Sequence, residues 1–233
     1  MKLFCLSYAG GNATFYNGLE EKLNKRIELI KLEYSGHGDR RREPFYNSFK
    51  ELAMDLYKQI KNEVSSGEGY ALFGYSMGSI GVVELLKLID LNSEIKMPKH
   101  IFLAAHEPNT IKAPKESSDE ELTALIKNRT IQLGGVPKVL IDNKSFWRMY
   151  LPVISADYKM IVHYSFEDLN YQTTLSTTII YSQEDTPIAE MEKWHNICIG
   201  DIDYYRFNGS HFFMKEYEKE ISDIVLNKLT KEM

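Results

Sequence analysis

Residues 74–78, with the sequence GYSMG, have the form G-x-S-x-G, a turn that presents a serine between a strand and a helix. A serine hydroxyl is a weak nucleophile at neutral pH, so a catalytic serine needs a neighbouring base and N–H groups that receive the oxyanion. The apolar run Tyr70 to Phe73 is typical of a buried strand, and Ile80 to Ile89 is typical of a helix packed on a sheet. The sequence therefore predicts that Ser76 is a nucleophile.

The base for this serine has to come from one of six histidines. His211 follows the last predicted strand and precedes the C-terminal helix, and a triad in the chain order Ser, acid, His places its base last. We therefore expect His211 to be the general base. His37 lies in a turn that could border the site, although a plain loop role is favoured. The remaining four are interpreted as surface or capping residues: His100, His106, His163 and His195.

The acid that orients the histidine should follow a late strand. Asp185 does so, because it comes a short turn after the apolar run Thr177 to Tyr181. Two carboxylates compete with it: the neighbouring Glu184, and Glu107 after an earlier strand. An Asp before Thr-Pro is also common as a turn or capping residue. Asp185 is the acid that we expect.

The oxyanion site should combine the N–H of Met77, directly after the nucleophile, with one from the loop after the first strand. In that loop, residues 7–13 read SYAGGNA. The glycine pair lets the backbone bend so that an N–H points into the site, and Ala9 is the expected second donor. A phosphate cradle is disfavoured, since neither G-x-G-x-x-G nor a G-K-[ST] ending is present.

Short β-branched or aromatic runs alternate with helical patterns along the chain, which predicts an α/β fold with a mostly parallel central sheet flanked by helices. The predicted strands are 2–6, 28–32, 70–73, 101–104, 177–181 and 203–207. The predicted helices are 14–24, 49–64, 77–89, 189–197 and 212–229.

A long segment of about 109–175 interrupts this rhythm with helical patterns alone. We interpret it as a helical lid over the active-site end, inserted into one domain of residues 1–233 whose core is about 1–108 and 176–233. Its aromatic-rich part, 145–164, includes Trp147 and Tyr150 and suits the lining of an apolar substrate pocket. Extra core helices are the alternative interpretation.

The composition fits such an enzyme and excludes other classes. The chain has 233 residues, 43% hydrophobic and 26% charged, which suffices for a large core without disulfides. Cys5 and Cys198 are expected to be buried free thiols, and reduced thiols fit a cytoplasmic protein. The apolar run at Met1 to Ser7 is too short for a signal peptide, and no run is long enough to span a membrane. A net charge of −5 gives no support for nucleic-acid binding.

Seven segments together resemble type II (external, editing) thioesterases, the stand-alone hydrolases of nonribosomal peptide and polyketide synthesis, within the α/β-hydrolase superfamily. These segments follow the family's order over nearly the whole chain: 3–11, 36–40, 74–78, 133–137, 151–158, 191–194 and 209–213. The family usually has Pro at the position of Ser7 and His at that of Tyr75. The resemblance supports Asp185 over Glu107, because chain-releasing relatives tend to place the acid after an earlier strand.

The resemblance implies the substrate and the partner. The substrate would be an acyl or aminoacyl thioester on the phosphopantetheine arm of an acyl or peptidyl carrier protein. No metal or separate cofactor is expected, because the nucleophile and the oxyanion donors come from the protein and the phosphopantetheine belongs to the carrier. Further substrate contacts are predicted at Tyr8, Gly10, Tyr75, Trp147 and Tyr150. The protein is expected to be a monomer that binds neither nucleic acid nor membrane.

Other functions stay open at this point. A general acyl-thioester, small-ester or lipid hydrolase would use the same triad, and a chain-releasing thioesterase is usually fused to its synthetase. A non-catalytic binding module should have lost a triad member, and none is lost. Carrier proteins are commonly acidic, so basic side chains could steer one to the site, although charged loops are usually only solvated. The candidates are Arg40, Arg41, Arg42, Lys112, Lys115 and Lys138.

Overall fold

The structure is a computed structural model that describes residues 1–23, 26–64, 68–109 and 119–231. In these residues six strands form one sheet with the order β2-β1-β3-β4-β5-β6, and every neighbouring pair is parallel. The strands are β1 (Lys2–Leu6), β2 (Glu28–Lys31), β3 (Tyr70–Tyr75), β4 (His100–Ala104), β5 (Thr177–Ser182) and β6 (Ile202–Phe207). The predicted parallel sheet is confirmed, and β3 runs two residues further than predicted.

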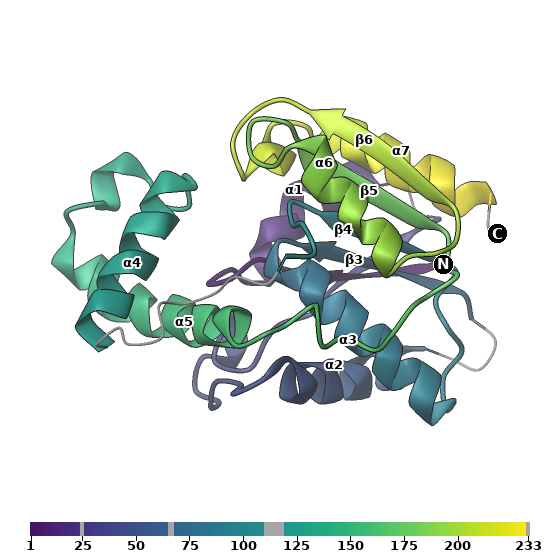
Figure 1. The fold of residues 1–233 in the computed structure, drawn as a ribbon, viewed down its shortest axis with the longest axis horizontal. Helices are drawn as coiled ribbons and strands as arrows, with labels where there is room; N and C mark the ends of the chain where they lie inside the picture. Colours follow the sequence, from purple (N-terminus) through teal and green to yellow (C-terminus); the bar gives the residue numbers. More distant parts are fainter. Residues whose placement is uncertain (24–25, 65–67, 110–118, 232–233) are drawn as a thin grey trace.

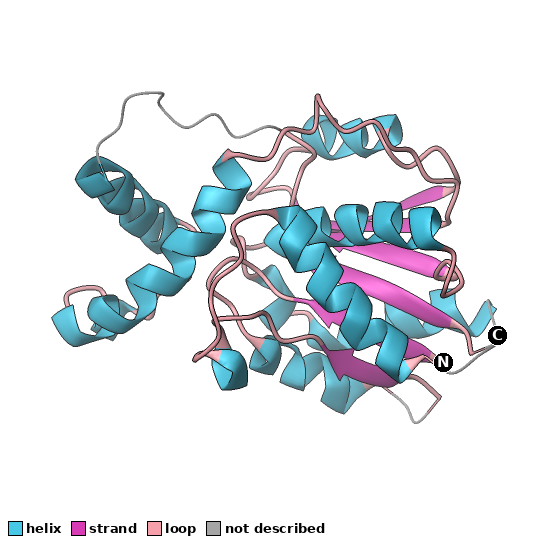
Figure 2. Ribbon diagram, turned by 90° about the horizontal axis from the view of Figure 1, so that it is seen from below, coloured by secondary structure: helices cyan, strands magenta, loops and turns pink. Residues whose placement is uncertain are grey.

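Helices cover both faces of this sheet (Figure 1). The helices α2 (Phe49–Glu63), α3 (Met77–Asn92) and α6 (Ile188–Met191) pack on one face. The helices α1 (Asn17–Lys22) and α7 (Glu218–Lys231) pack on the other. Figure 2 shows the same layers from below, with helices in front of the strands and behind them.

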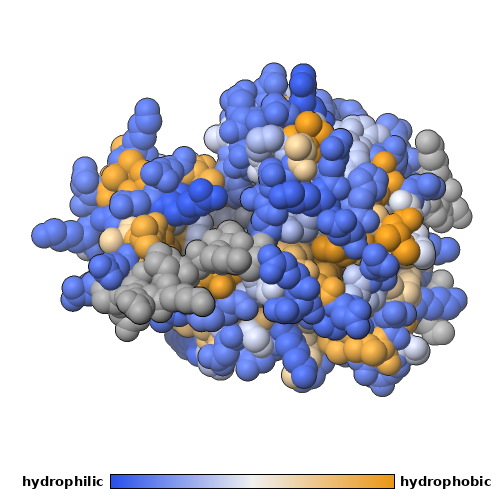
Figure 3. Space-filling model, in the orientation of Figure 1, coloured by the Kyte–Doolittle hydropathy of each residue, from blue (hydrophilic) through white to orange (hydrophobic). Residues whose placement is uncertain are grey.

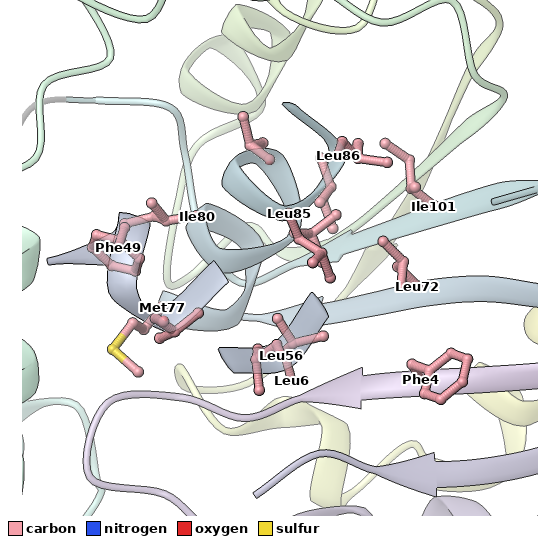
Figure 4. Packing of buried hydrophobic residues seen from close by; sticks show 14 of the residues in the cluster. Phe4, Leu6, Phe49, Leu56, Leu72, Met77, Ile80, Leu85, Leu86 and Ile101 are labelled. Atoms are coloured by element: carbon pink, nitrogen blue, oxygen red, sulfur yellow. The ribbon is translucent and has the colours of Figure 1, made fainter. Parts of the chain in front are cut away.

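Successive side chains of a strand point to opposite faces of the sheet, so alternate residues pack against the two layers of helices. Phe4 and Leu6 of β1 point to the α2/α3 side, while Leu3 and Cys5 point to the α1/α7 side. Figure 4 shows Leu6 together with Leu56 of α2 near the start of α3. β3 and β4 are buried along their whole length, which explains why the sequence shows continuous apolar runs there.

Two helices lie beyond the end of the sheet and account for most of the predicted insertion (Figure 1). They are α4 (Asp119–Gln132) and α5 (Lys144–Val162), joined through a 3₁₀ turn at Lys138–Leu140. α5 contains Pro152, which has no N–H to donate within the helix. The division of the chain into core and lid stays a prediction.

Three predicted helices are shorter than expected. The helix predicted at 14–24 is a 3₁₀ turn at Ala13–Tyr16 followed by α1, and that at 189–197 is α6 followed by a 3₁₀ turn at Glu192–Asn196. α7 begins only at Glu218. It follows a 3₁₀ turn at Phe213–Lys215. Each of the three 3₁₀ turns contains a buried aromatic side chain, such as Trp194, whose Nε1–H donates to the His106 carbonyl.

Candidate active site

The predicted site residues meet at one edge of the sheet because all six strands are parallel and their carboxyl ends lie together. Ser76 directly follows β3, and Asp185 comes three residues after β5. His211 follows β6 by four residues, and Ala9 follows β1 by three. Side chains far apart in the sequence are thereby brought to one place.

Ser76 sits in a strained turn between β3 and α3, with φ +54° and ψ −118°. A non-glycine residue rarely adopts a positive φ, and such strain concentrates at functional sites. The flanking glycines make the turn possible. A Cβ at Gly78 would lie 2.2 Å from the Leu6 carbonyl oxygen, and one at Gly74 would lie 2.4 Å from the Gly78 oxygen. Backbone segments that approach this closely leave no room for a side chain.

Ser76, His211 and Asp185 form a continuous chain of polar contacts. The Ser76 Oγ lies 3.0 Å from Nε2 of His211, and Nδ1 of His211 lies 2.8 Å from Oδ2 of Asp185. His211 is 9% exposed, so the chain is largely shielded from water. With the carboxylate accepting from Nδ1–H, Nε2 is left free to take the serine proton.

The two competing carboxylates have other surroundings, although Glu107 also lines a pocket at Ser76. Glu107 accepts a hydrogen bond from Oγ1 of Thr186 at 3.3 Å, and Glu184 is exposed. The turn that presents Asp185 is closed by its own N–H, which donates to the Ser182 carbonyl. The geometry therefore pairs His211 with Asp185.

The loop that carries His211 is anchored from β3 and β5. The Tyr75 hydroxyl donates to the His211 carbonyl at 2.6 Å, and Ser182 Oγ donates to the Gly209 carbonyl. Tyr75 is fully buried between its neighbours. This placement corrects the predicted substrate contact at Tyr75, since its side chain faces the core and the histidine loop.

Ala9 and Met77, the predicted oxyanion donors, both lie beside Ser76. Met77 is the first residue of α3, where N–H groups have no partner within the helix, and Ala9 lines two pockets together with Ser76. Among the described residues, neither backbone N–H has a hydrogen-bond acceptor. Both groups are therefore free to bind a ligand oxygen.

Two adjoining pockets open at Ser76 and His211. One lies against the insertion and is mainly apolar, with a lining that includes Tyr8, Leu133, Tyr150, Ile154, Tyr158 and Phe212. The other is more polar and includes His106, Glu107 and Arg129. Tyr8 and Tyr150 thus lie where substrate contacts were predicted. Trp147 does not, because it is buried within the insertion with its Nε1–H donating to the Ile141 carbonyl.

Two histidines predicted as surface or capping residues are buried instead. His100 contacts Thr178 Oγ1 through Nε2 at 2.8 Å, and burial lowers the pKa of His100 to about 4. His106 lies beside the triad, and burial together with nearby His211 lowers the pKa of His106 to about 3. Among the described residues, the buried Nε2 of His106 has no hydrogen-bond partner. His100 is the first residue of β4 and His106 lies just beyond its end, and no pattern in the sequence indicated that these polar residues are buried.

His37, predicted to occupy a plain loop, belongs to a buried polar cluster beside the site. Its Nε2 lies 2.9 Å from Oδ2 of Asp157 in α5, and the same oxygen accepts the Gly10 N–H at 2.7 Å. Gly10, a predicted substrate contact, therefore has its N–H directed at Asp157. A single Asp in an apolar helix pattern could have signalled such a partner, and the sequence reasoning did not use it.

The predicted basic docking residues differ in their surroundings. Arg40 is paired with Glu43 and Asp55 rather than free. Lys138 is exposed, while Lys112 and Lys115 lie outside the described residues.

In the described ranges, no cluster of three or more His, Cys, Asp or Glu could hold a metal ion. No helix in those ranges is long and apolar enough to cross a membrane.

A parallel sheet with a strained serine turn and a Ser-His-Asp chain at its carboxyl edge defines an enzyme of the α/β-hydrolase fold. The chain belongs to the thioesterase family, whose Thioesterase domain model matches residues 1–232. The protein is thus a serine hydrolase that acts on thioesters, as the sequence predicted.

Relatives and solved structures agree with this assignment. The medium-chain S-acyl fatty acid synthase thioesterase of Rattus norvegicus is 28% identical over 223 residues, which cover 94% of this chain and 83% of the relative. ClbQ from the colibactin NRPS/PKS pathway superposes with a TM-score of 0.84 at 26% identity, covering 99% of this chain and 97% of that chain. The type II thioesterase BorB from the borrelidin cluster gives 0.81 at 27% identity, covering 98% and 92%.

Proposed function

We propose that the protein is a stand-alone editing thioesterase that removes acyl or aminoacyl groups from the phosphopantetheine arm of carrier proteins. The observation that carries this proposal is the contact chain from Ser76 through His211 to Asp185 in a member of the thioesterase family. The similarity to ClbQ and BorB, which come from biosynthetic pathways of natural products, supports a nonribosomal peptide or polyketide synthetase as the setting.

In the proposed first half of the reaction, Ser76 Oγ attacks the thioester carbonyl while His211 Nε2 takes the hydroxyl proton. Asp185 stabilises the resulting imidazolium. The N–H groups of Ala9 and Met77 donate to the oxyanion of the tetrahedral intermediate. The intermediate collapses to an acyl-serine as the C–S bond breaks, and His211 returns its proton to the departing thiolate.

In the second half, a water molecule attacks the acyl-serine while His211 again acts as base, and the carboxylic acid leaves as Ser76 is restored. Apart from this water, each step uses groups that the protein itself supplies, so this mechanism needs no metal or diffusible cofactor. The phosphopantetheine belongs to the carrier protein and is part of the substrate.

The two pockets suggest how the substrate lies. We propose that the acyl chain lies on the α5 side of Ser76, where aromatic side chains such as Tyr150 and Phe212 line the apolar pocket. The surface of the insertion offers a carrier both apolar and basic side chains, since Val139, Met149 and Lys138 are all exposed. Figure 3 shows apolar side chains at this end of the molecule. We propose that an acidic carrier docks there.

A second candidate is the release of medium-chain fatty acyl groups from a fatty acid synthase. The relative from Rattus norvegicus, whose name states that activity, favours it. This candidate shares the mechanism and differs in the acyl group and the carrier.

A hydrolysis panel separates the candidates. Acetyl, aminoacyl and medium-chain groups are loaded on one carrier protein, and matched oxygen esters serve as controls. Editing predicts the highest kcat/KM for acetyl or aminoacyl groups, and a preference for medium chains would favour release of fatty acyl groups. Faster turnover of oxygen esters than of thioesters would contradict both. Light scattering during gel filtration checks the expected monomer.

A further inference from the structure

The carboxylate of Asp157 is nearly inaccessible, at 1% exposure, although it lies on α5 outside the sheet. Burying a charge is costly unless it is paired and hydrogen-bonded. Both conditions are met. Oδ2 of Asp157 accepts the Gly10 N–H at 2.7 Å and lies 2.9 Å from Nε2 of His37. The Asp157 side chain thereby connects α5 to two separate loops, the one after β1 that contains Gly10 and the one after β2 that contains His37.

The hydrogen bonds of His37 fit a charged pair with Asp157. Nδ1 of His37 lies 3.0 Å from the carbonyl oxygen of Ser35, and a carbonyl can only accept, so Nδ1 carries a proton. A proton on Nε2 is needed for the contact with the Asp157 carboxylate. Burial disfavours the imidazolium, but the bond to Asp157 and the charges of Asp157 and Glu33 outweigh it and raise the pKa of His37.

The Gly10 N–H belongs to the loop that carries the proposed oxyanion donor. The Gly11 N–H donates to the Tyr8 carbonyl at 2.8 Å, which closes a four-residue turn with Ala9 and Gly10 at its centre. Gly10 has φ +75°, as the third position of a type II turn requires. The Asp157 bond therefore fixes the orientation of the peptide that directly follows Ala9.

Helix α5 also contacts this turn through neighbouring side chains. A Cβ at Gly10 would lie 2.7 Å from the Tyr150 hydroxyl and 3.0 Å from Cβ of Ile154. Tyr150, Ile154 and Asp157 are spaced i, i+4, i+7 and so share one face of the helix. Only a glycine lets the turn approach that face closely enough for the Gly10 N–H to reach the carboxylate.

The segment that carries His37 also holds the start of the same loop. The Tyr34 hydroxyl donates to the Ser7 carbonyl at 2.8 Å, and the His37 N–H donates to the Tyr34 carbonyl at 3.1 Å. The loop is thus fastened at Ser7 and at Gly10. Between these two points Ala9 faces both pockets beside Ser76.

We propose that Asp157, paired with His37, is a positioning residue that orients the Ala9 N–H toward the oxyanion. Transition-state stabilisation then depends on the position of α5 against the loop that carries Ala9. This inference rests on the proposed function, because it assumes that Ala9 is an oxyanion donor. Removing one oxyanion donor lowers kcat by about 10²- to 10³-fold, so displacing a donor without removing it should lower kcat by a smaller factor.

The test compares the wild type with Asp157→Asn in two assays. For Asp157→Asn we expect kcat on an acyl-pantetheine thioester to fall about 10- to 100-fold with KM changed less than about threefold. An alkylthio trifluoromethyl ketone forms a hemiketal oxyanion with the active serine, so its Ki should rise by the same factor as kcat/KM falls. The product carboxylate, which forms no oxyanion, should bind both proteins equally.

Two further variants separate positioning from a loss of packing. Tyr164→Phe removes the hydrogen bond from Tyr164 to Glu84, which also ties the insertion to the core but lies outside both pockets, and it should leave both assays unchanged. His37→Gln keeps a donor toward Asp157 and should lose less than Asp157→Asn. If Asp157→Asn fails to fold, His37→Gln carries the comparison. The double variant should be no worse than Asp157→Asn alone, because the pair acts as a unit.

The inference is overturned if the variants lose kcat/KM while the Ki of the ketone stays at the wild-type value, or if only KM changes. Additive losses in the double variant would overturn it as well. A wild-type protein without thioesterase activity would instead refute the proposed function, so the two failures are distinguishable.

Discussion

Replacing Asp185 by Asn should remove most of the activity while leaving the fold intact. Oδ2 of Asp185 lies 2.8 Å from Nδ1 of His211, and both side chains are 10% exposed. At a charge separation of about 4 Å and an effective dielectric constant of about 20, the carboxylate stabilises the imidazolium by about 4 kcal/mol, which is roughly 10³-fold in rate. An Asn side chain can also hold the histidine in the wrong tautomer, so a loss of about 10³- to 10⁴-fold in kcat is expected.

The assay measures the thiol released from an acyl-pantetheine thioester with a chromogenic disulfide. Cys5 and Cys198 are both buried, so the folded enzyme should contribute little background. The matched control is Glu107→Gln, which changes a nearby carboxylate that contacts Thr186 and should alter kcat less than about threefold. The reasoning is refuted if Asp185→Asn retains more than about a tenth of the activity, or if Glu107→Gln is the more damaging change.

Two predictions concern stability. Gly78→Ala should lower the free energy of unfolding in urea by about 3 kcal/mol, because the added Cβ would meet the Leu6 carbonyl. The control Gly69→Ala, whose added Cβ would have no contact closer than 3.6 Å, should change that free energy little. Equal effects of the two variants would contradict this prediction. The pKa of about 3 for His106, below 6.5 for the unfolded chain, means that the unfolded state binds the proton more readily, so stability falls as pH drops from about 6.5 toward 3. Between pH 7.5 and pH 5 the free energy of unfolding should fall by about 2 kcal/mol because of His106, and His106→Gln should not show this loss. An equal loss in both proteins would refute the low pKa of His106.

The sequence predicted the sheet and the triad because both leave strong local signals. β3 and β4 are buried on both faces and read as continuous apolar runs, and the G-x-S-x-G turn follows β3 directly. Parallel strands then bring Asp185 and His211 to the same edge without any long-range information.

What the sequence missed depends on contacts between distant segments. The burial of His106 has no local pattern that predicts it. The single Asp157 in an apolar helix signals a buried partner, but it does not identify that partner as His37, 120 positions away. Tyr75 was predicted to contact the substrate. The alternation of side chains along β3 turns it to the opposite side, where it supports the His211 loop.

The central claim is that Ser76 forms the acyl-enzyme intermediate in thioester hydrolysis. The most direct measurement is rapid quenching of the enzyme with an acyl-pantetheine thioester, followed by mass spectrometry of the peptide that contains residues 74–78. We predict an added acyl mass on Ser76 in the wild type, and in Ser76→Ala no added mass, no turnover above background and an unchanged circular dichroism spectrum. An acyl group on another residue, or near wild-type turnover by Ser76→Ala, would contradict the account.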